Sequence, residues 1–131
     1  MPLTAAAVDT ILGRIFATPW GALVQFGLLD GDPRAGGLEL TAEDNPGYAR
    51  VTVTDWAGFW GDPVDGEIQG AKFFFPNATD AWGSSAVFEG IWVNGVLWDF
   101  EPIEDDVAAE SAGPGPWLLP RRGFNERADL S

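Results

Sequence analysis

Acidic side chains are the residues of this chain with the greatest capacity for chemistry. Asp30 and Asp32 flank a glycine, as the first two ligands of an EF-hand-like calcium loop do. Pro33 and Arg34 interrupt the ligand pattern, however, and no acid stands at its twelfth position. The sequence therefore favours solvated turn acids over a calcium site, and it predicts neither a metal nor a cofactor.

Tryptophans are the second group that could bind a ligand, and the chain contains 7 of them. Trp56 and Trp60 are candidate glycan-stacking residues, because exposed aromatic rings offer flat apolar platforms. Hydrolysis of a sugar would also require two carboxylates placed across the glycosidic bond. Tryptophans at strand positions are more common in cores and subunit contacts, so carbohydrate binding is kept only as an alternative.

Two residue types are missing, histidine and cysteine. Their absence excludes Ser-His-Asp and Cys-His nucleophile systems, zinc fingers and disulfides. A Ser-Lys dyad would have to use Lys72, the only lysine, and no serine lies near it in the sequence. The sequence thus predicts a protein that is not an enzyme.

The charge is strongly unbalanced, with 20 acidic against 7 basic residues and a formal net charge of -13. Nucleic-acid binding depends on lysines and arginines that displace counterions, so no nucleic-acid partner is expected. No apolar run approaches the roughly 20 residues of a membrane helix. We also find no signal-peptide pattern, and we expect synthesis in the host cytoplasm with no membrane partner.

The elements that must position these residues begin with a short helix. Thr4 is a suitable N-cap, because its hydroxyl can accept an amide of the first turn. Pro19 disfavours helical geometry at the residue before it and ends the element. The apolar residues recur at helical spacing, which predicts an amphipathic helix. They are Val8, Ile11, Leu12, Ile15 and Phe16.

Strand patterns follow the helix. Residues 22–29 are nearly all apolar, as in a strand buried on both faces, whereas residues 50–54 alternate. Residues 73–75 predict a short aromatic strand. Asn94 and Gly95 lie between two apolar runs and predict a type I′ hairpin. The expected cross-strand pairs are Val93 with Val96, Trp92 with Leu97, Ile91 with Trp98, Gly90 with Asp99 and Glu89 with Phe100.

Together these patterns predict a mainly β protein, an antiparallel jelly-roll-like β-sandwich with one N-terminal amphipathic helix. Residues 1–100 form the helix and sandwich core, and residues 101–131 form an acidic loop and a basic C-terminal arm of the same single domain. Both hairpin faces carry large apolar groups. We place the face of Ile91 and Trp98 inward, and Trp92 and Leu97 are subunit-contact candidates.

The basic C-terminal arm supplies the other subunit-contact candidates, Arg121, Arg122 and Arg127. Arginine forks bind carboxylates at two points. We therefore expect the arm to reach an acidic surface of another subunit, with residues 101–106 of a second copy as one option.

Several segments resemble a family of small tailed-phage virion proteins, often labelled phage tail fibre protein and similar to capsid decoration or head-fibre base proteins. The resemblance covers residues 4–100. Its most specific segment is Phe75-Pro76-Asn77-Ala78-Thr79-Asp80-Ala81-Trp82-Gly83. The supporting segments are Leu23 to Pro33, Gly47-Tyr48-Ala49-Arg50 and Gly90-Ile91.

The resemblance implies a non-enzymatic capsid decoration (cement) protein that binds the outer capsid surface and stabilises neighbouring subunits. Its partners would be the major capsid protein or other virion proteins, and its location the virion. A homo-oligomer is expected, with a trimer as one option. The alternative is a tail-fibre or baseplate component that recognises host glycans through Trp56 and Trp60.

Overall fold

The computed structural model describes residues 4–16 and 23–123, and it confirms a mainly β chain with antiparallel sheets. The chain divides into two compact units. The first unit comprises residues 1–21, 54–72 and 119–131, and the second comprises residues 22–53 and 73–118. Both units combine segments from the two sides of residue 100, so they do not follow the boundary expected from the sequence.

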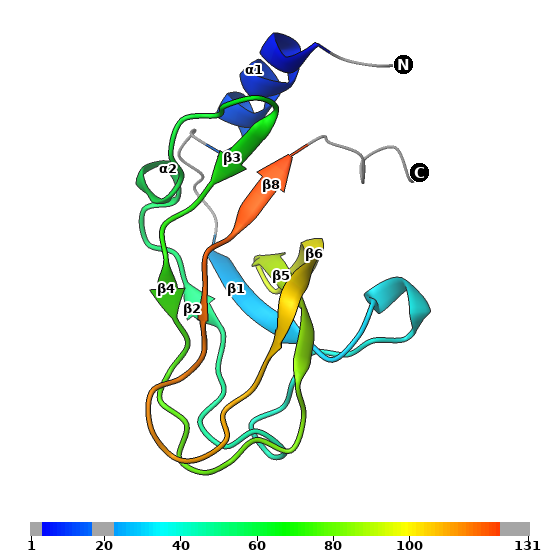
Figure 1. The fold of residues 1–131 in the computed structure, drawn as a ribbon, viewed down its shortest axis with the longest axis vertical. Helices are drawn as coiled ribbons and strands as arrows, with labels where there is room; N and C mark the ends of the chain where they lie inside the picture. Colours follow the sequence, from blue (N-terminus) through cyan, green and yellow to red (C-terminus); the bar gives the residue numbers. More distant parts are fainter. Residues whose placement is uncertain (1–3, 17–22, 124–131) are drawn as a thin grey trace. The chain divides into compact units, whose positions relative to one another are not determined.

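The first unit contains α1 (Ala5–Phe16), α2 (Trp56–Phe59), β3 (Glu67–Gln69) and β8 (Arg121–Gly123) (Figure 1). The Thr4 hydroxyl accepts a hydrogen bond from the Ala7 N–H (3.1 Å), as expected of an N-cap. Asp9 accepts one from the Gly66 N–H (2.7 Å) and joins α1 to the loop before β3. No helix among the described residues is long and apolar enough to cross a membrane.

The apolar stripe predicted for α1 falls largely on side chains outside the described residues. Those side chains are Val8, Leu12, Ile15 and Phe16. The 12-residue helix itself lies where the spacing and the Thr4 cap place it. Its amphipathic character therefore stays a prediction.

The second unit is built around a four-stranded antiparallel sheet in the order β2-β1-β5-β6. The strands are β1 (Val24–Leu29), β2 (Val51–Thr52), β5 (Ala86–Val93) and β6 (Val96–Val107). Within the run predicted at residues 22–29, β1 covers Val24–Leu29 and is buried along almost its whole length, as predicted. This unit also contains the short helix η1 (Pro33–Ala35) and an antiparallel pair, β4 (Phe73–Phe74) with β7 (Trp117–Leu118).

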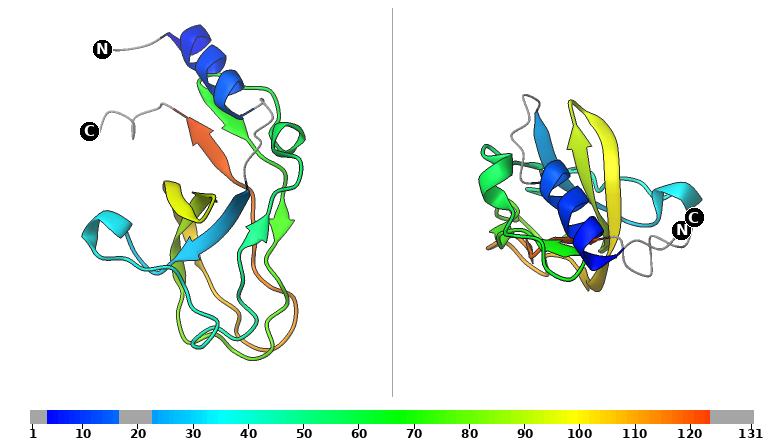
Figure 2. Two further views of the ribbon diagram at one scale, coloured as in Figure 1. Left: turned by 180° about the vertical axis from the view of Figure 1, so that it is seen from behind. Right: turned by 90° about the horizontal axis from the view of Figure 1, so that it is seen from above.

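The β5–β6 hairpin confirms the predicted turn, because Asn94 and Gly95 both have positive φ (50° and 82°). The right-hand view of Figure 2 shows its two strands side by side. The first two predicted pairs are correct, but a register shift at Ile91 and Trp92 then places Ile91 opposite Asp99. The predicted pairing of Ile91 with Trp98 is therefore wrong, and so are the next two predicted pairs, because Gly90 lies opposite Phe100 and Glu89 opposite Glu101.

Trp98 is the extra residue that β6 contains at this register shift, between Leu97 opposite Trp92 and Asp99 opposite Ile91. Its side chain is 47% exposed, although the sequence placed it on the inward face. A bulge gives one strand an extra residue and so changes the direction of the following side chains, which strict alternation cannot foresee.

The acidic residues 101–106 lie within β6, where the sequence predicted a loop. The strand continues because β5 offers it a long partner, with Glu89 opposite Glu101, Phe88 opposite Pro102 and Ala86 opposite Val107. β6 stands at the edge of the sheet order, and charged side chains on an edge strand oppose pairing with further strands.

Candidate functional site

Tyr48 enters the second unit from a four-residue turn. The Tyr48 N–H donates to the Asn45 C=O (2.9 Å), with Pro46 and Gly47 at the two central positions. Gly47 has a φ of +91°, as the third residue of a type II turn requires, and proline is common before it. The Pro-Gly sequence therefore determines where the chain turns and delivers Tyr48 to β1.

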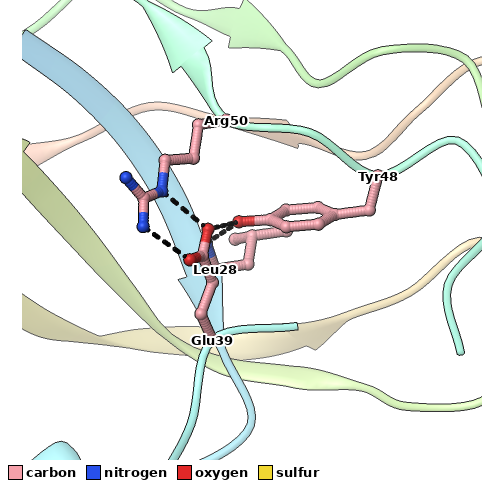
Figure 3. A network of polar contacts seen from close by, with 4 residues as sticks. All are labelled: Leu28, Glu39, Tyr48 and Arg50. Atoms are coloured by element: carbon pink, nitrogen blue, oxygen red, sulfur yellow. Dashed lines mark hydrogen bonds and ion pairs between the residues drawn. The ribbon is translucent and has the colours of Figure 1, made fainter. Parts of the chain in front are cut away.

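A polar cluster of Glu39, Tyr48 and Arg50 forms beside β1 (Figure 3). The Tyr48 hydroxyl accepts from the Leu28 N–H (3.0 Å) and donates to Glu39 Oε2 (2.7 Å). Arg50 binds the same carboxylate at two points, Nε to Oε2 (2.9 Å) and Nη2 to Oε1 (2.8 Å). Both carboxylate oxygens and the phenol are thus engaged within the chain.

Backbone pairing around β1 brings these side chains together. Glu39 pairs with Leu29 in an isolated antiparallel bridge, and the Leu40 N–H donates to the Leu28 C=O (3.0 Å). The loop after β1 therefore folds back along the strand that precedes it. Arg50 immediately precedes β2, which pairs with the other part of β1.

Trp92 closes the cluster on the side of β5. Its ring centroid lies 4.3 Å from the Arg50 guanidinium carbon, a cation–π arrangement. Gly27 and Gly90 face each other on β1 and β5. A Cβ at Gly27 would lie 2.6 Å from the Trp92 ring and 2.8 Å from the Tyr48 oxygen, and one at Gly90 would lie 2.7 Å from Trp92. Two glycines thus make the space for the indole.

The electrostatics of the cluster favour a fixed contact. Burial raises the pKa of Tyr48 far above its ordinary value, and the hydrogen bond to Glu39 raises it further. The hydrogen bonds that Arg50 donates to the Glu39 carboxylate raise the pKa of Arg50 as well. At neutral pH Tyr48 is therefore a neutral phenol and Arg50 a cation. These contacts fit an architectural role, because a general base or nucleophile needs an available lone pair near substrate.

The most specific segment of the resemblance, Phe75–Gly83, packs against the supporting segment Gly47–Arg50 at Tyr48. The Phe75 ring stacks on Tyr48 with centroids 6.1 Å apart, and Trp82 contacts Tyr48 edge-on at 5.9 Å. The Trp82 indole N–H and the Thr79 backbone N–H both donate to the Pro46 C=O (3.1 Å each). The motif residues therefore form one scaffold.

The two segments of this scaffold approach each other closely along their backbones. A Cβ at Gly47 would overlap the backbone oxygen of Asn77, so the first segment leaves no room for a side chain there. The Gly83 N–H donates to the Asp44 C=O (2.7 Å). The buried Asn45 side chain adds a hydrogen bond beside this contact, because its amide oxygen accepts from the Ser84 N–H (3.1 Å).

The predicted aromatic site residues are buried in their own chain. Trp56 and Trp60 are only 4% and 5% exposed and pack edge to face at 5.4 Å, so they are not the solvent-open glycan platforms of the alternative hypothesis. Trp92 is only 5% exposed and lies under the Arg50 side chain, so little of its ring is open to another subunit. Trp92 is covered by a segment that is distant in the sequence, whereas Trp56 and Trp60 pack against each other.

The predicted basic arm is also partly used within its own chain. Arg121 is exposed and lies 3.9 Å from Glu67, so its subunit contact stays a prediction. Arg122 is buried in β8, which corrects its assignment as a surface contact. Arg127 lies outside the described residues. Leu97 is half-buried, and its subunit contact stays a prediction.

Asp30 and Asp32 act in turns. Asp30 accepts from the Leu38 N–H (2.8 Å), while Asp32 caps η1 by accepting from the Arg34 N–H (2.8 Å) and also pairs with the Arg34 side chain (2.9 Å). Across residues 4–16 and 23–123, the structure contains no group of three or more acidic side chains placed to hold a metal ion.

Sequence reasoning missed Glu39 and Asn45 as key polar residues. The Asn45-Pro46-Gly47 run is a recognisable turn signal and could have identified Asn45. Glu39 has no such local signal, because its partners come from residues 28, 48 and 50 through long-range pairing.

Comparison of the chain with protein-family models, with curated proteins and with solved structures gave no match.

Proposed function

We propose that the protein is a non-enzymatic structural component of a tailed-phage virion, acting as a capsid decoration protein. The observation that carries this proposal is the interlocking of the Gly47–Arg50 and Phe75–Gly83 segments around Tyr48. The segments that resemble the virion family are used to hold the fold together, and their reactive groups are engaged with one another. This arrangement suits a protein that acts by presenting a stable surface.

The net charge of -13 supports the same proposal. An acidic exterior repels free and packaged nucleic acid and keeps the unassembled protein soluble. The partners are then the major capsid protein or other virion proteins, with neighbouring subunits bridged at a specific interface. Interfaces of this kind bury roughly 1,200 to 2,000 Å².

We also propose that the second unit is a small jelly-roll-like sandwich. The rings of Phe26 on β1 and Phe73 on β4 lie 5.0 Å apart, and Phe73 in turn contacts Phe75 at 5.4 Å. These contacts link the four-stranded sheet to the β4–β7 pair through an aromatic layer, as two packed sheets do.

Electron microscopy of particles assembled with and without the protein tests the proposed function. We expect additional density on the outer capsid surface only when the protein is present, together with greater resistance of the particles to heat. Density confined to the tail would contradict the proposal and favour the tail-fibre alternative. Glycan recognition by a tail fibre would need stacking residues other than Trp56 and Trp60, because both are buried.

The basic-arm hypothesis requires a narrower deletion than the whole C-terminal segment. Residues 121–123 pair with β3, so their removal would damage the first unit. A chain ending at Gly123 removes Arg127 and keeps β8. We expect lower occupancy of this shortened chain on particles, and further loss in an Arg121→Gln variant. If the shortened chain and its Arg121→Gln variant both occupied particles as fully as the wild type, the hypothesis that the arm contacts another subunit would be contradicted.

A further inference from the structure

An uncharged ribbon runs through the second unit of this acidic chain. Residues 73–79 and 111–118 contain no charged residue, whereas 21% of the whole chain is charged. β4 pairs with β7, the Phe75 N–H donates to the Pro116 C=O (2.8 Å), and Ala78 and Gly113 form a further bridge. Residues 73–78 and 113–118 together are called the uncharged ribbon below; β4 marks its position in Figure 1.

The ribbon has an inner and an outer set of side chains. The buried set consists of Phe75, Ala78, Gly115 and Leu118. The exposed set includes Phe74, Pro76, Pro114 and Trp117. Phe74 and Trp117 stand directly opposite each other in the register and are 54% and 50% exposed. The outer surface is therefore free of charge and mostly apolar and aromatic, with Asn77 as an exposed polar residue.

We propose that this outer surface is the docking site for a second copy of the same chain. Two copies that each carry a net charge of -13 repel each other wherever acidic surfaces meet, as at the exposed Glu104, Asp105 and Asp106 of β6. Contact through the uncharged ribbon brings no like charges together. A basic or neutral partner would have no reason to avoid the acidic surfaces, whereas a second copy of this acidic chain does, so we assign the ribbon to a second copy.

The contact is isologous, with Phe74 of one copy set against Trp117 of the other. Aromatic pairs of this kind prefer offset or edge-to-face packing. The exposed parts of the two rings offer roughly 200 Å², well below the about 800 Å² per partner of a standard interface. Self-association in solution is therefore weak, with a Kd of roughly 0.1 to 1 mM.

This inference deepens the proposed function, on which it rests for its biological setting. Copies held side by side on a capsid have a high effective concentration, so even a weak lateral contact becomes occupied. Self-association of the isolated protein tests the ribbon alone, and binding of the protein to particles tests the proposed function. Either can fail without the other.

Sedimentation equilibrium of the full chain from about 0.01 to about 1 mM tests the contact. We expect the average mass to rise with concentration, and Phe74→Ser or Trp117→Ser to raise the apparent Kd roughly tenfold or more. Trp98→Ser is the matched control, because Trp98 is similarly exposed (47%) but lies on β6. A wild-type monomer throughout, or an equal effect of Trp98→Ser, would overturn the proposal.

A second measurement keeps the test independent of the folding of those variants. The chain has no cysteine, so a single introduced cysteine reports one position. Asn77→Cys lies on the exposed side of the ribbon, and Ala42→Cys is an exposed control in the loop before Tyr48. With a short thiol-reactive crosslinker we expect dimers of the Asn77→Cys chain and few of the Ala42→Cys chain. Equal yields from the two would reject the ribbon as the contact.

Discussion

The Tyr48 hydroxyl takes part in two hydrogen bonds, one from the Leu28 N–H and one to Glu39. It thereby connects the backbone of a buried strand to a carboxylate that Arg50 also binds. A buried donor left without a partner costs free energy, typically about 1 to 3 kcal/mol. The stability of the second unit should therefore respond to single substitutions in this cluster.

Arg50 and Arg34 form a matched pair for testing the cluster. Each binds a carboxylate and lies over an aromatic ring, Arg50 over Trp92 (4.3 Å) and Arg34 over Phe100 (5.2 Å). The Arg50 side chain is 26% exposed and that of Arg34 is 70% exposed. We expect Arg50→Gln to lower the free energy of unfolding by about 1 to 2 kcal/mol.

Arg34→Gln changes the net charge equally, yet water already surrounds its ion pair. We expect it to have a much smaller effect than Arg50→Gln. Urea denaturation of the two variants measures the difference, and equal destabilisation would show that burial of the cluster is unimportant.

Tyr48 also predicts the behaviour of the protein at high pH. Burial raises its pKa in the folded state, so folding favours the protonated phenol. This contribution to stability is fully present below the unfolded-state pKa of about 10 and is lost as the pH rises above it. Tyr48→Phe removes that dependence and lowers stability at neutral pH by about 1 to 3 kcal/mol.

Tyr48 is the single tyrosine of the chain, so tyrosinate absorbance follows this residue alone. We expect the absorbance to appear together with loss of the near-ultraviolet circular dichroism. Titration at an ordinary pKa in a chain that remains folded would contradict the burial of the phenol.

At the scale of elements, the β5–β6 hairpin combines a locally determined turn with a register that is not local. Asn94 and Gly95 adopt positive φ, and the Asn94 side chain accepts from the Leu23 N–H (3.0 Å). This bond ties the turn to the start of β1. The register shift beyond Trp92 then directs Trp98 to the surface.

Gly95→Ala tests the turn without a steric complication. A Cβ at Gly95 would have nothing within 4 Å, so any cost reflects the positive φ alone. We expect a loss of about 1 kcal/mol in unfolding free energy. Gly61→Ala is the control, because its Cβ would make only an ordinary contact 3.5 Å from the Gln69 oxygen. Equal effects from the two substitutions would argue against a strained turn.

For the whole molecule, the dominant property is the imbalance of charge. Self-repulsion among acidic residues destabilises a compact chain, and salt screens it. We expect the Tm to rise between about 0.02 and about 0.3 M NaCl. A chain with Glu104→Gln, Asp105→Asn and Asp106→Asn should start from a higher Tm and respond less. A Tm that falls with salt in both chains would contradict the repulsion.

Neutralising these three positions has a further expected consequence at the edge of the sheet. Charges on an edge strand oppose its pairing with other strands. Light scattering of the same variant should therefore show more aggregation during refolding than the wild type shows.

The sequence by itself was sufficient for features that depend on neighbouring residues. Local spacing and backbone preference account for the Thr4 cap, the buried strand Val24–Leu29, the positive-φ turn at Asn94 and Gly95 and the mainly β composition. The charge imbalance is likewise a property of composition alone.

The tertiary structure alone decided which tryptophans are covered, where Glu39 finds its partners and which side of the hairpin faces water. Trp56, Trp60 and Trp92 are buried, whereas Trp98 and Trp117 are exposed. Burial depends on segments that return from far along the chain, and one inserted residue in a strand redirects the side chains that follow it. Local pattern carries no information about either event.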